Sequence, residues 1–229
     1  MEAFREALRL VFSFDKELWQ IIGVTMRMSL TSTTISCLLG IPLGVLFGST
    51  NFRGKTMLMR VLHTLMGLPP VVAGLFVFLL LSRSGPLGSL RLLFTVEAMI
   101  IAQCVLITPI VAGLSSSIVG ATAPALLEKA KGLHLSRKTI LKLLLAENKI
   151  TLISVVLTGF GRAISEVGAV SLVGGNIMFK TRVMTTAIML ETNKGNFEFA
   201  IALGILLLLI AFIINYAVSF FRKDGTVLR

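Results

Sequence analysis

The chain of 229 residues is 55% hydrophobic and only 14% charged, and its mean hydropathy is +0.91. A soluble domain carries about 25% charged residues, so this composition excludes a soluble globular protein, and it also excludes a disordered chain, which has low hydrophobicity. The net charge of +11 does not indicate a nucleic-acid partner, because the basic residues are spread through short segments between apolar stretches. The composition predicts an integral membrane protein.

Residues 1–17 are not expected to be a cleavable leader, because they carry four acidic side chains and no small-residue cleavage site. The distribution of basic residues, given below, makes them an extracytoplasmic segment. Apolar residues recur there at the spacing of a helix, at Phe4, Leu8, Val11 and Phe12. This pattern is typical of a short helix at the membrane interface, and a frayed terminus fits it equally well.

Five windows with few or no charges follow, and each is long enough to cross a bilayer as a helix, which takes about 20 apolar residues. They cover residues 18–51, 61–82, 98–127, 150–179 and 199–221. Apolar runs such as residues 205–210 lack the alternation of barrel strands, so helices are the remaining way to satisfy the backbone in lipid. The sequence therefore predicts an all-α integral membrane domain over residues 18–222 with five transmembrane helices.

Small residues and prolines in these windows predict local features of the helices. Gly40, Gly44 and Gly48 lie four residues apart on one face of the first span, which favours close packing within one bundle. Prolines are expected to kink or break the spans at Pro42, Pro69, Pro70, Pro109 and Pro124. Hydroxyl residues between Ser29 and Ser36 either line an aqueous route or hydrogen-bond within the first helix.

The distribution of basic residues predicts the orientation in the membrane. Residues 49–60, 120–149 and 222–229 hold 12 Lys and Arg against 3 acidic residues, whereas residues 1–17, 83–97 and 180–198, of nearly equal total length, hold 8 against 7. Cytoplasmic segments carry the excess of Lys and Arg. We therefore place the amino terminus outside and the carboxyl terminus inside, with residues 223–229 as a short cytoplasmic tail.

Residues 122–147, between the third and fourth windows, are too charged to span a membrane and too apolar to form a flexible loop. Thr122 and Pro124 predict the start of one helix, and Ser136 predicts the N-cap of a second helix. We expect two short helices that meet at a bend and project into the cytoplasm. Their apolar ridges and basic flanks require a protein partner.

This segment resembles the EAA loop of permease subunits in type I ABC importers, with Glu128-Lys129-Ala130 at the Glu-Ala-Ala positions and Ser136-Arg137 at the usual Ser-Arg. Lys129 replaces the first alanine of that pattern and His134 stands at its turn glycine, so Gly132 is expected to provide the bend. The resemblance implies that an ATP-binding subunit docks on this segment through Glu128, Ala130, Gly132, Leu133, His134, Ser136 and Arg137.

The fourth window makes the resemblance more specific. Several stretches in and after this window are similar to oxyanion permeases of the molybdate and tungstate group, and most similar to the tungstate-type branch. They are residues 159–170, the sequence Val173-Gly174-Gly175-Asn176-Ile177, residues 185–188 and residues 191–197. The resemblance extends over residues 18–222. It implies a multi-pass protein of a prokaryotic cytoplasmic membrane that works as a homodimer with two ATP-binding subunits and an extracytoplasmic oxyanion-binding protein.

Three alternatives to tungstate import stay open at this point. The same machine could import molybdate, sulfate or phosphate, and proteins of a different class, an ion channel or a membrane enzyme, could share the composition. The chain has no Walker-type phosphate-binding sequence, so ATP hydrolysis is expected from a separate subunit and not from this chain. Cys37 and Cys104 lie inside apolar runs, so we expect no disulfide, metal site or cofactor.

Arg162 and Glu166 are charged residues inside the fourth window. A charge at mid-bilayer costs about 2.5–3.5 kcal/mol or more, so such residues face protein or water and have partners. Their spacing of four residues permits a salt bridge on one helix face. We favour a structural pair, which locks packing or gates the cavity, over an arginine that passes the anion, because a paired arginine is not free to hold substrate.

Overall fold

A computed structural model describes residue 9 and residues 16–223, and these residues form helices with no strand. The helices are α2 (Lys16–Ser49), α3 (Lys55–Met66), α4 (Pro70–Leu81), the short 3₁₀ helix η1 (Gly88–Leu90), α5 (Val96–Gly132), α6 (Arg137–Ile164), α7 (Gly168–Gly174), α8 (Met184–Asn193) and α9 (Phe197–Lys223). Apart from residue 9, the expected interfacial helix near the amino terminus lies outside the described residues, as does the tail beyond residue 223.

The all-helical class predicted from the sequence is confirmed for the described residues, and three of their helices are long and apolar enough to cross a membrane. These are α2, the stretch Val96–Ala130 of α5 and the stretch Phe197–Tyr216 of α9. They coincide with the first, third and fifth predicted windows. The bent pair α3 and α4 makes a fourth candidate if the two helices together form one span.

The second predicted window is divided between α3 and α4, which meet at an angle of 98°. Pro69 is the N-cap of α4 and Pro70 is its first residue, a position where the missing N–H of proline costs nothing. The residue before a proline is disfavoured in the helical conformation, so α3 stops before Leu68. The predicted break therefore occurs at this proline pair, whereas Pro42 and Pro109 lie inside continuous helices.

The fourth predicted window is divided as well. Its helix, α6, begins far upstream at Arg137 and ends at Ile164, and the short helix α7 follows after residues 165–167. Helix α6 is not among the three single helices that pass the length and composition test for a span.

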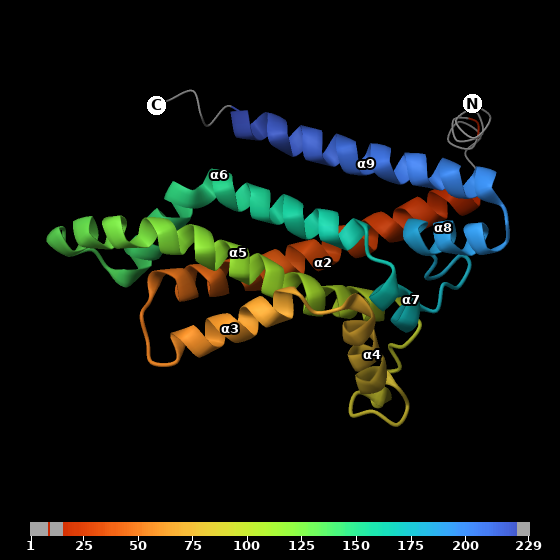
Figure 1. Ribbon diagram of the computed structural model, residues 1–229, viewed down its shortest axis with the longest axis horizontal. Coiled ribbons are helices and arrows are strands. Elements are labelled where there is room, and N and C mark those ends of the chain that lie inside the picture. Colours follow the sequence, from red (N-terminus) through yellow and green to blue (C-terminus); the bar gives the residue numbers. More distant parts are fainter. Residues whose placement is uncertain (1–8, 10–15, 224–229) are drawn as a thin grey trace.

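The centre of the bundle is the contact between α2 and α5, which run side by side (Figure 1). At Gly44 the two backbones are so close that an added Cβ atom would lie 2.6 Å from the carbonyl oxygen of Ala112 and 2.5 Å from Cβ of Ser115. Gly40 and Gly48 make similar approaches to α5. The small-residue face predicted for the first span is therefore a packing surface within the chain.

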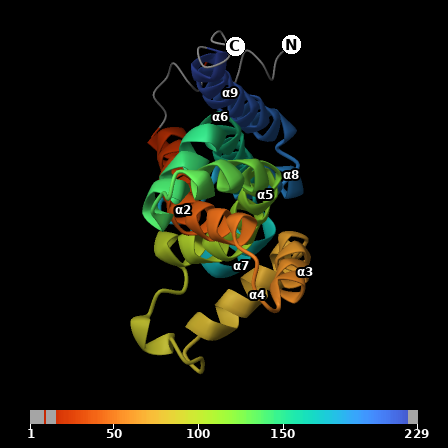
Figure 2. The same ribbon diagram turned by 90° about the vertical axis from the view of Figure 1, so that its left-hand side faces the viewer.

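Helices α9 and α4 lie on opposite sides of this centre in both views (Figures 1 and 2). Helix α9 packs on α8, while α4 packs on α7 with Gly74 directly against Ala169. The loop after α4, residues 82–95, extends away from the bundle (Figure 2, yellow).

Candidate functional site

The segment between the third and fourth windows is the junction of two long helices. Helix α5 continues to Gly132, residues 133–136 turn the chain, and α6 begins at Arg137. The predicted helix start at Thr122 and Pro124 is wrong, because Pro124 lies inside α5 and the Thr122 hydroxyl donates to the Val119 carbonyl of the same helix. The two short helices expected here are the ends of α5 and α6, which we call the knob (residues 122–147).

The turn at the tip of the knob differs from the expectation in one residue. Gly132 is the last residue of α5, and the left-handed conformation falls on His134, with φ 49°. The backbone N–H of Leu135 donates to the Ala130 carbonyl at 3.2 Å and closes the turn. Ser136 caps α6 by accepting a hydrogen bond from the Thr139 N–H at 3.3 Å, which confirms the predicted N-cap.

Replacing His134 with glycine is expected to raise the thermal stability of the purified protein. A residue with a Cβ pays about 1–2 kcal/mol in the left-handed region, and glycine removes this strain. Because glycine also makes the unfolded chain more flexible, the net gain is about 1 kcal/mol or less. His134→Ala is the matched control, since alanine keeps the Cβ and the strain. Equal melting temperatures for the two variants would contradict the prediction.

The base of the knob is anchored to the bundle. Leu144 of α6 is fully buried beside Val45 of α2 and Val119 of α5. The amide of Asn148 donates to the Thr122 hydroxyl at 2.8 Å and to the Leu144 carbonyl at 2.8 Å, and so joins α6 to α5. The knob is therefore fixed to α2 and α5 and cannot move independently of them without breaking these contacts.

The tip of the knob presents an apolar and charged surface. Leu133 is 70% exposed, and Glu128, His134 and Arg137 are exposed around it. Ala130, in contrast, is only 2% exposed, so its side chain already packs within the chain. The tip of the knob therefore offers exposed apolar and polar side chains, whereas Ala130 is already packed.

Arg162 and Glu166 form the ion pair that their spacing predicts. Nη1 of Arg162 lies 3.0 Å from Oε2 of Glu166, and the Glu166 side chain is 3% exposed against 33% for Arg162. The two residues do not share a helix face, however, because α6 ends at Ile164 between them. The other carboxylate oxygen, Oε1, accepts the Ala169 N–H at 3.1 Å, near the start of α7. Glu166 therefore joins the end of α6 to the beginning of α7.

A second polar contact holds the same end of α6. Nε2 of Gln103, in α5, donates to the Ala163 carbonyl at 2.7 Å, and its Oε1 accepts from the Ser32 hydroxyl of α2 at 2.5 Å. Gln103 is fully buried and ties three helices together at the place where α6 ends. A glutamine inside an apolar window indicates from the sequence that the side chain has a buried hydrogen-bond partner. The partners of Gln103 lie 60 and 71 residues away along the chain, so the sequence does not identify them.

The knob and the Arg162–Glu166 pair lie at opposite ends of α6. Arg137 is its first residue and Arg162 lies two residues before its end, a separation of about 38 Å at 1.5 Å per residue. The structure thus brings the predicted docking residues together at one end of a single helix and the predicted intramembrane pair at the other.

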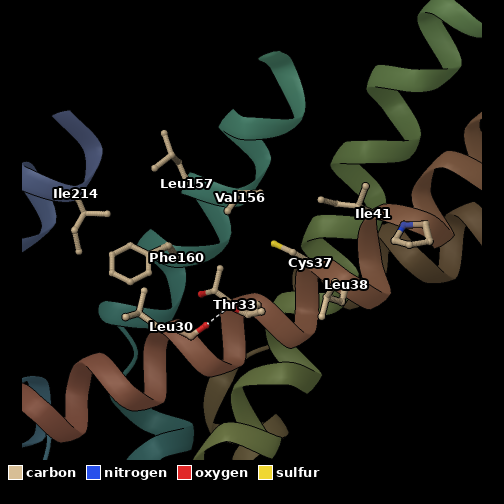
Figure 3. Close-up of a pocket in the computed structure, with 11 residues that line it drawn as sticks. Leu30, Thr33, Cys37, Leu38, Ile41, Val156, Leu157, Phe160 and Ile214 are labelled. Carbon is tan, nitrogen blue, oxygen red and sulfur yellow. Dashed lines mark hydrogen bonds between the residues drawn. The ribbon is translucent and has the colours of Figure 1, made fainter. Parts of the chain in front are cut away.

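An apolar hollow with a volume of about 530 Å³ lies between α2, α6 and α9. Figure 3 shows Leu30 and Cys37 of α2, Phe160 of α6 and Ile214 of α9 around it. Its lining contains no charged residue, and the hydroxyl of Thr34 donates to the Leu30 carbonyl of its own helix. Burying an unpaired dianion in such surroundings is very costly, so this hollow does not suit an oxyanion.

Charged side chains at the start of α2 and around α8 form ion pairs that the sequence did not predict. Arg182 lies 2.8 Å from Glu17, and Lys194 lies 2.8 Å from Glu191. The hydrogen bond from Lys194 holds the pKa of Glu191 below its usual value. Arg182 and Glu17 are 165 residues apart, so only the fold reveals their contact.

The chain is similar to known permeases in sequence and to a solved transporter in fold. The chain is 43% identical over 223 residues to the tungstate uptake system permease protein of Peptoclostridium acidaminophilum, covering 97% of this chain and 98% of that one. It is 41% identical over 207 residues to a probable anion ABC transporter permease protein of Haloferax volcanii, covering 88% and 89%. The crystal structure of a bacterial ABC transporter that imports the acidic polysaccharide alginate matches with a TM-score of 0.74 at 20% identity, covering 95% of this chain and 83% of that one.

The membrane-length helices and their similarity to that transporter define the fold of an ABC importer permease. Residues 40–224 match the family described as binding-protein-dependent transport system inner membrane component, and the chain belongs to this family. It is a multi-pass protein of the inner membrane.

Proposed function

We propose that the chain is the translocation subunit of an ATP-driven importer for tungstate. The similarity to a tungstate permease over nearly the full length of both chains carries this proposal, since the sulfate permeases compared with the chain are 23–29% identical to it. Tungstate and molybdate are nearly identical tetrahedral dianions, so molybdate import by the same machine is the main alternative. A separate ATP-binding subunit supplies the energy.

The partners of the proposed machine are a second copy of this chain, two ATP-binding subunits and an extracytoplasmic oxyanion-binding protein. The knob is the docking site for the ATP-binding subunit. When that subunit closes on ATP, it displaces the tip of the knob. Because α6 runs without interruption from Arg137 to Ile164, the displacement reaches the Arg162–Glu166 pair and α7. This coupling along one helix would open the pore alternately to the two faces.

In the proposed topology, α2, the bent pair α3–α4, α5, α6 and α9 are the five spans, with the knob in the cytoplasm. The excess of basic residues in residues 120–149 supports this orientation. Single cysteines at Ser136 and Asn193, in a background without Cys37 and Cys104, are expected to react with an impermeant thiol reagent only from the inside and only from the outside, respectively. Labelling of Ser136→Cys from outside, together with protection of Asn193→Cys from the external reagent, would show that the proposed orientation is wrong.

Leu133→Asp is expected to reduce co-purification of the ATP-binding subunit at least about tenfold, because the change puts a charge on the exposed tip that the partner must bury. Ala130, although part of the docking segment, is a poorer probe, since a bulky charge at this buried position disturbs the knob itself. Leu87→Asp, at a 44% exposed leucine in the loop after α4, is the matched control. Equal co-purification of the two variants would count against docking at the knob.

The substrate is tested with the complete complex in liposomes and with the purified binding protein. Calorimetry of the binding protein with tungstate, molybdate and sulfate ranks the three anions, and uptake of the preferred anion should require ATP. A preference for sulfate would overturn the assignment of tungstate. Uptake that proceeds without ATP would indicate a channel and would overturn the importer itself.

A further inference from the structure

The loop that connects α4 to α5, residues 82–95, has a defined conformation and carries two arginines, Arg83 and Arg91. The loop folds back on the end of α4, where the Leu87 N–H donates to the Leu80 carbonyl at 3.0 Å. Gly85 packs so tightly against the Leu79 carbonyl that no side chain fits there. At its far end, the Phe94 N–H donates to the Val173 carbonyl of α7 at 2.9 Å. The loop is therefore attached both to α4 and to α7.

Within the part of the chain that the structure describes, Arg83 and Arg91 have no carboxylate partner, unlike Arg182 and Lys194 of the predicted extracytoplasmic segment 180–198. Among the described residues of segments 83–97 and 180–198, Arg182 and Lys194 form ion pairs, and Arg83, Arg91 and Lys180 do not. Among the described residues of these two segments, three basic side chains therefore lack an ion-pair partner, and two of the three occur in one loop.

Arg83 and Arg91 also line the same cavity, which has a volume of about 920 Å³ and includes the hydroxyl residue Ser89. Leu81 and Leu93 form part of its apolar wall. Arg91 is held in the left-handed conformation, with φ 50°, at the end of η1. The cavity thus combines two guanidinium groups and a hydroxyl donor on a fixed loop, with enough room for a hydrated anion.

We infer that Arg83 and Arg91 form a receiving site for a tetrahedral oxyanion dianion at the outer mouth of the permease. This inference rests on the proposed function and assigns to the chain its own point of contact with the transported anion. A guanidinium presents several N–H donors in a fork that matches the oxygens of an oxyanion, and two such groups balance a charge of −2. Since both arginines are exposed, the site holds the anion weakly and releases it readily, which suits a transfer point.

The position of the cavity supports this role. Phe94 lines the cavity and also packs against Gly175, which follows α7. Helix α7 begins two residues after Glu166, whose carboxylate forms the ion pair with Arg162 near the end of α6. An anion bound in the cavity would therefore be linked to the end of α7 through Phe94, which contacts both the cavity and Gly175.

The test is binding of tungstate to the purified full-length chain in nanodiscs, without partners, by equilibrium dialysis at low ionic strength. The double variant R83Q/R91Q is expected to lose about tenfold or more in affinity, as charge focusing raises local anion concentration by at least this factor. R83K/R91K, which keeps the charges and loses the forks, should fall between the two. Lys180→Gln is the matched control, because Lys180 is equally unpaired but does not line the cavity, and it should bind like the wild type.

Three results would overturn the inference: no tungstate binding by the wild type, unchanged binding by R83Q/R91Q, or equal losses in R83Q/R91Q and Lys180→Gln. If R83Q/R91Q binds tungstate like the wild type, and a separate assay with the purified binding protein shows that it has lost affinity for that protein, the loop is a protein-docking surface and the inference is wrong. Failure of the proposed function is a separate result, namely no ATP-dependent uptake by the wild-type complex in liposomes.

Discussion

Gly44→Val is expected to destabilise the permease by about 3 kcal/mol or more, because the new side chain has no space between α2 and α5. Its Cβ alone would lie 2.6 Å from the Ala112 carbonyl oxygen and 2.9 Å from the Ser116 nitrogen. These are backbone atoms of a neighbouring helix, so rotation of a side chain cannot relieve the clash. The two helices would have to separate, and the contact that organises the bundle would be lost.

Gly23→Val on the same helix is the matched control, because a Cβ at Gly23 meets no atom within 4 Å. Valine has a slightly better helix propensity than glycine, so this variant should be as stable as the wild type or slightly more stable. Thermal unfolding in detergent measures both effects. If both variants lose the same amount of thermal stability, the loss comes from a β-branched residue in α2 at any position, and not from the close contact between Gly44 and α5.

Hydropathy was sufficient to locate the parts of the fold that are continuous apolar helices. The windows at residues 18–51, 98–127 and 199–221 each contain a single long helix, α2, α5 and α9. For these segments, lipid leaves the backbone no alternative to a helix, so composition alone determines the structure. The same reasoning cannot locate helix ends, because an apolar residue is equally acceptable on either side of a break.

Prolines gave an ambiguous signal for those breaks. Pro69 and Pro70 interrupt the second window, but Pro124 lies inside α5 and misled the prediction of the knob. A proline in a membrane helix is tolerated when neighbouring groups satisfy the freed carbonyl, and this depends on tertiary contacts. The break in the fourth window occurs without any proline, where the Glu166 carboxylate binds the Ala169 N–H and starts a new helix.

Local spacing in the sequence predicted two structural features of the candidate site. The Ser136 cap and the Arg162–Glu166 pair follow from local spacing, and both are present. The buried ties made by Gln103 and Asn148 depend on which helices become neighbours, which a single sequence does not state. The unpaired state of Arg83 and Arg91 likewise becomes visible only after the partners of the other basic residues are known.

The Arg162–Glu166 pair predicts an asymmetric response to single substitutions. Arg162→Met leaves the Glu166 carboxylate, 3% exposed, without its counterion, and breaking a buried pair in this way costs about 3–5 kcal/mol. Glu166→Gln should cost clearly less, because Arg162 is one-third exposed and can reach water or headgroups. Glutamine also keeps an oxygen that can accept the Ala169 N–H, so the start of α7 is preserved.

If the pair is structural, the double variant R162M/E166Q should recover most of the stability lost by Arg162→Met, because no charge then remains buried. We expect a coupling free energy above about 1 kcal/mol in a double-mutant cycle on thermal stability, together with partial uptake by the double variant. If Arg162 instead handles the anion, the double variant should fold and transport nothing, and Arg162→Lys should keep part of the activity as a point charge. Additive stability effects combined with abolished uptake would show that Arg162 serves transport and that the pair does not hold α6 to α7.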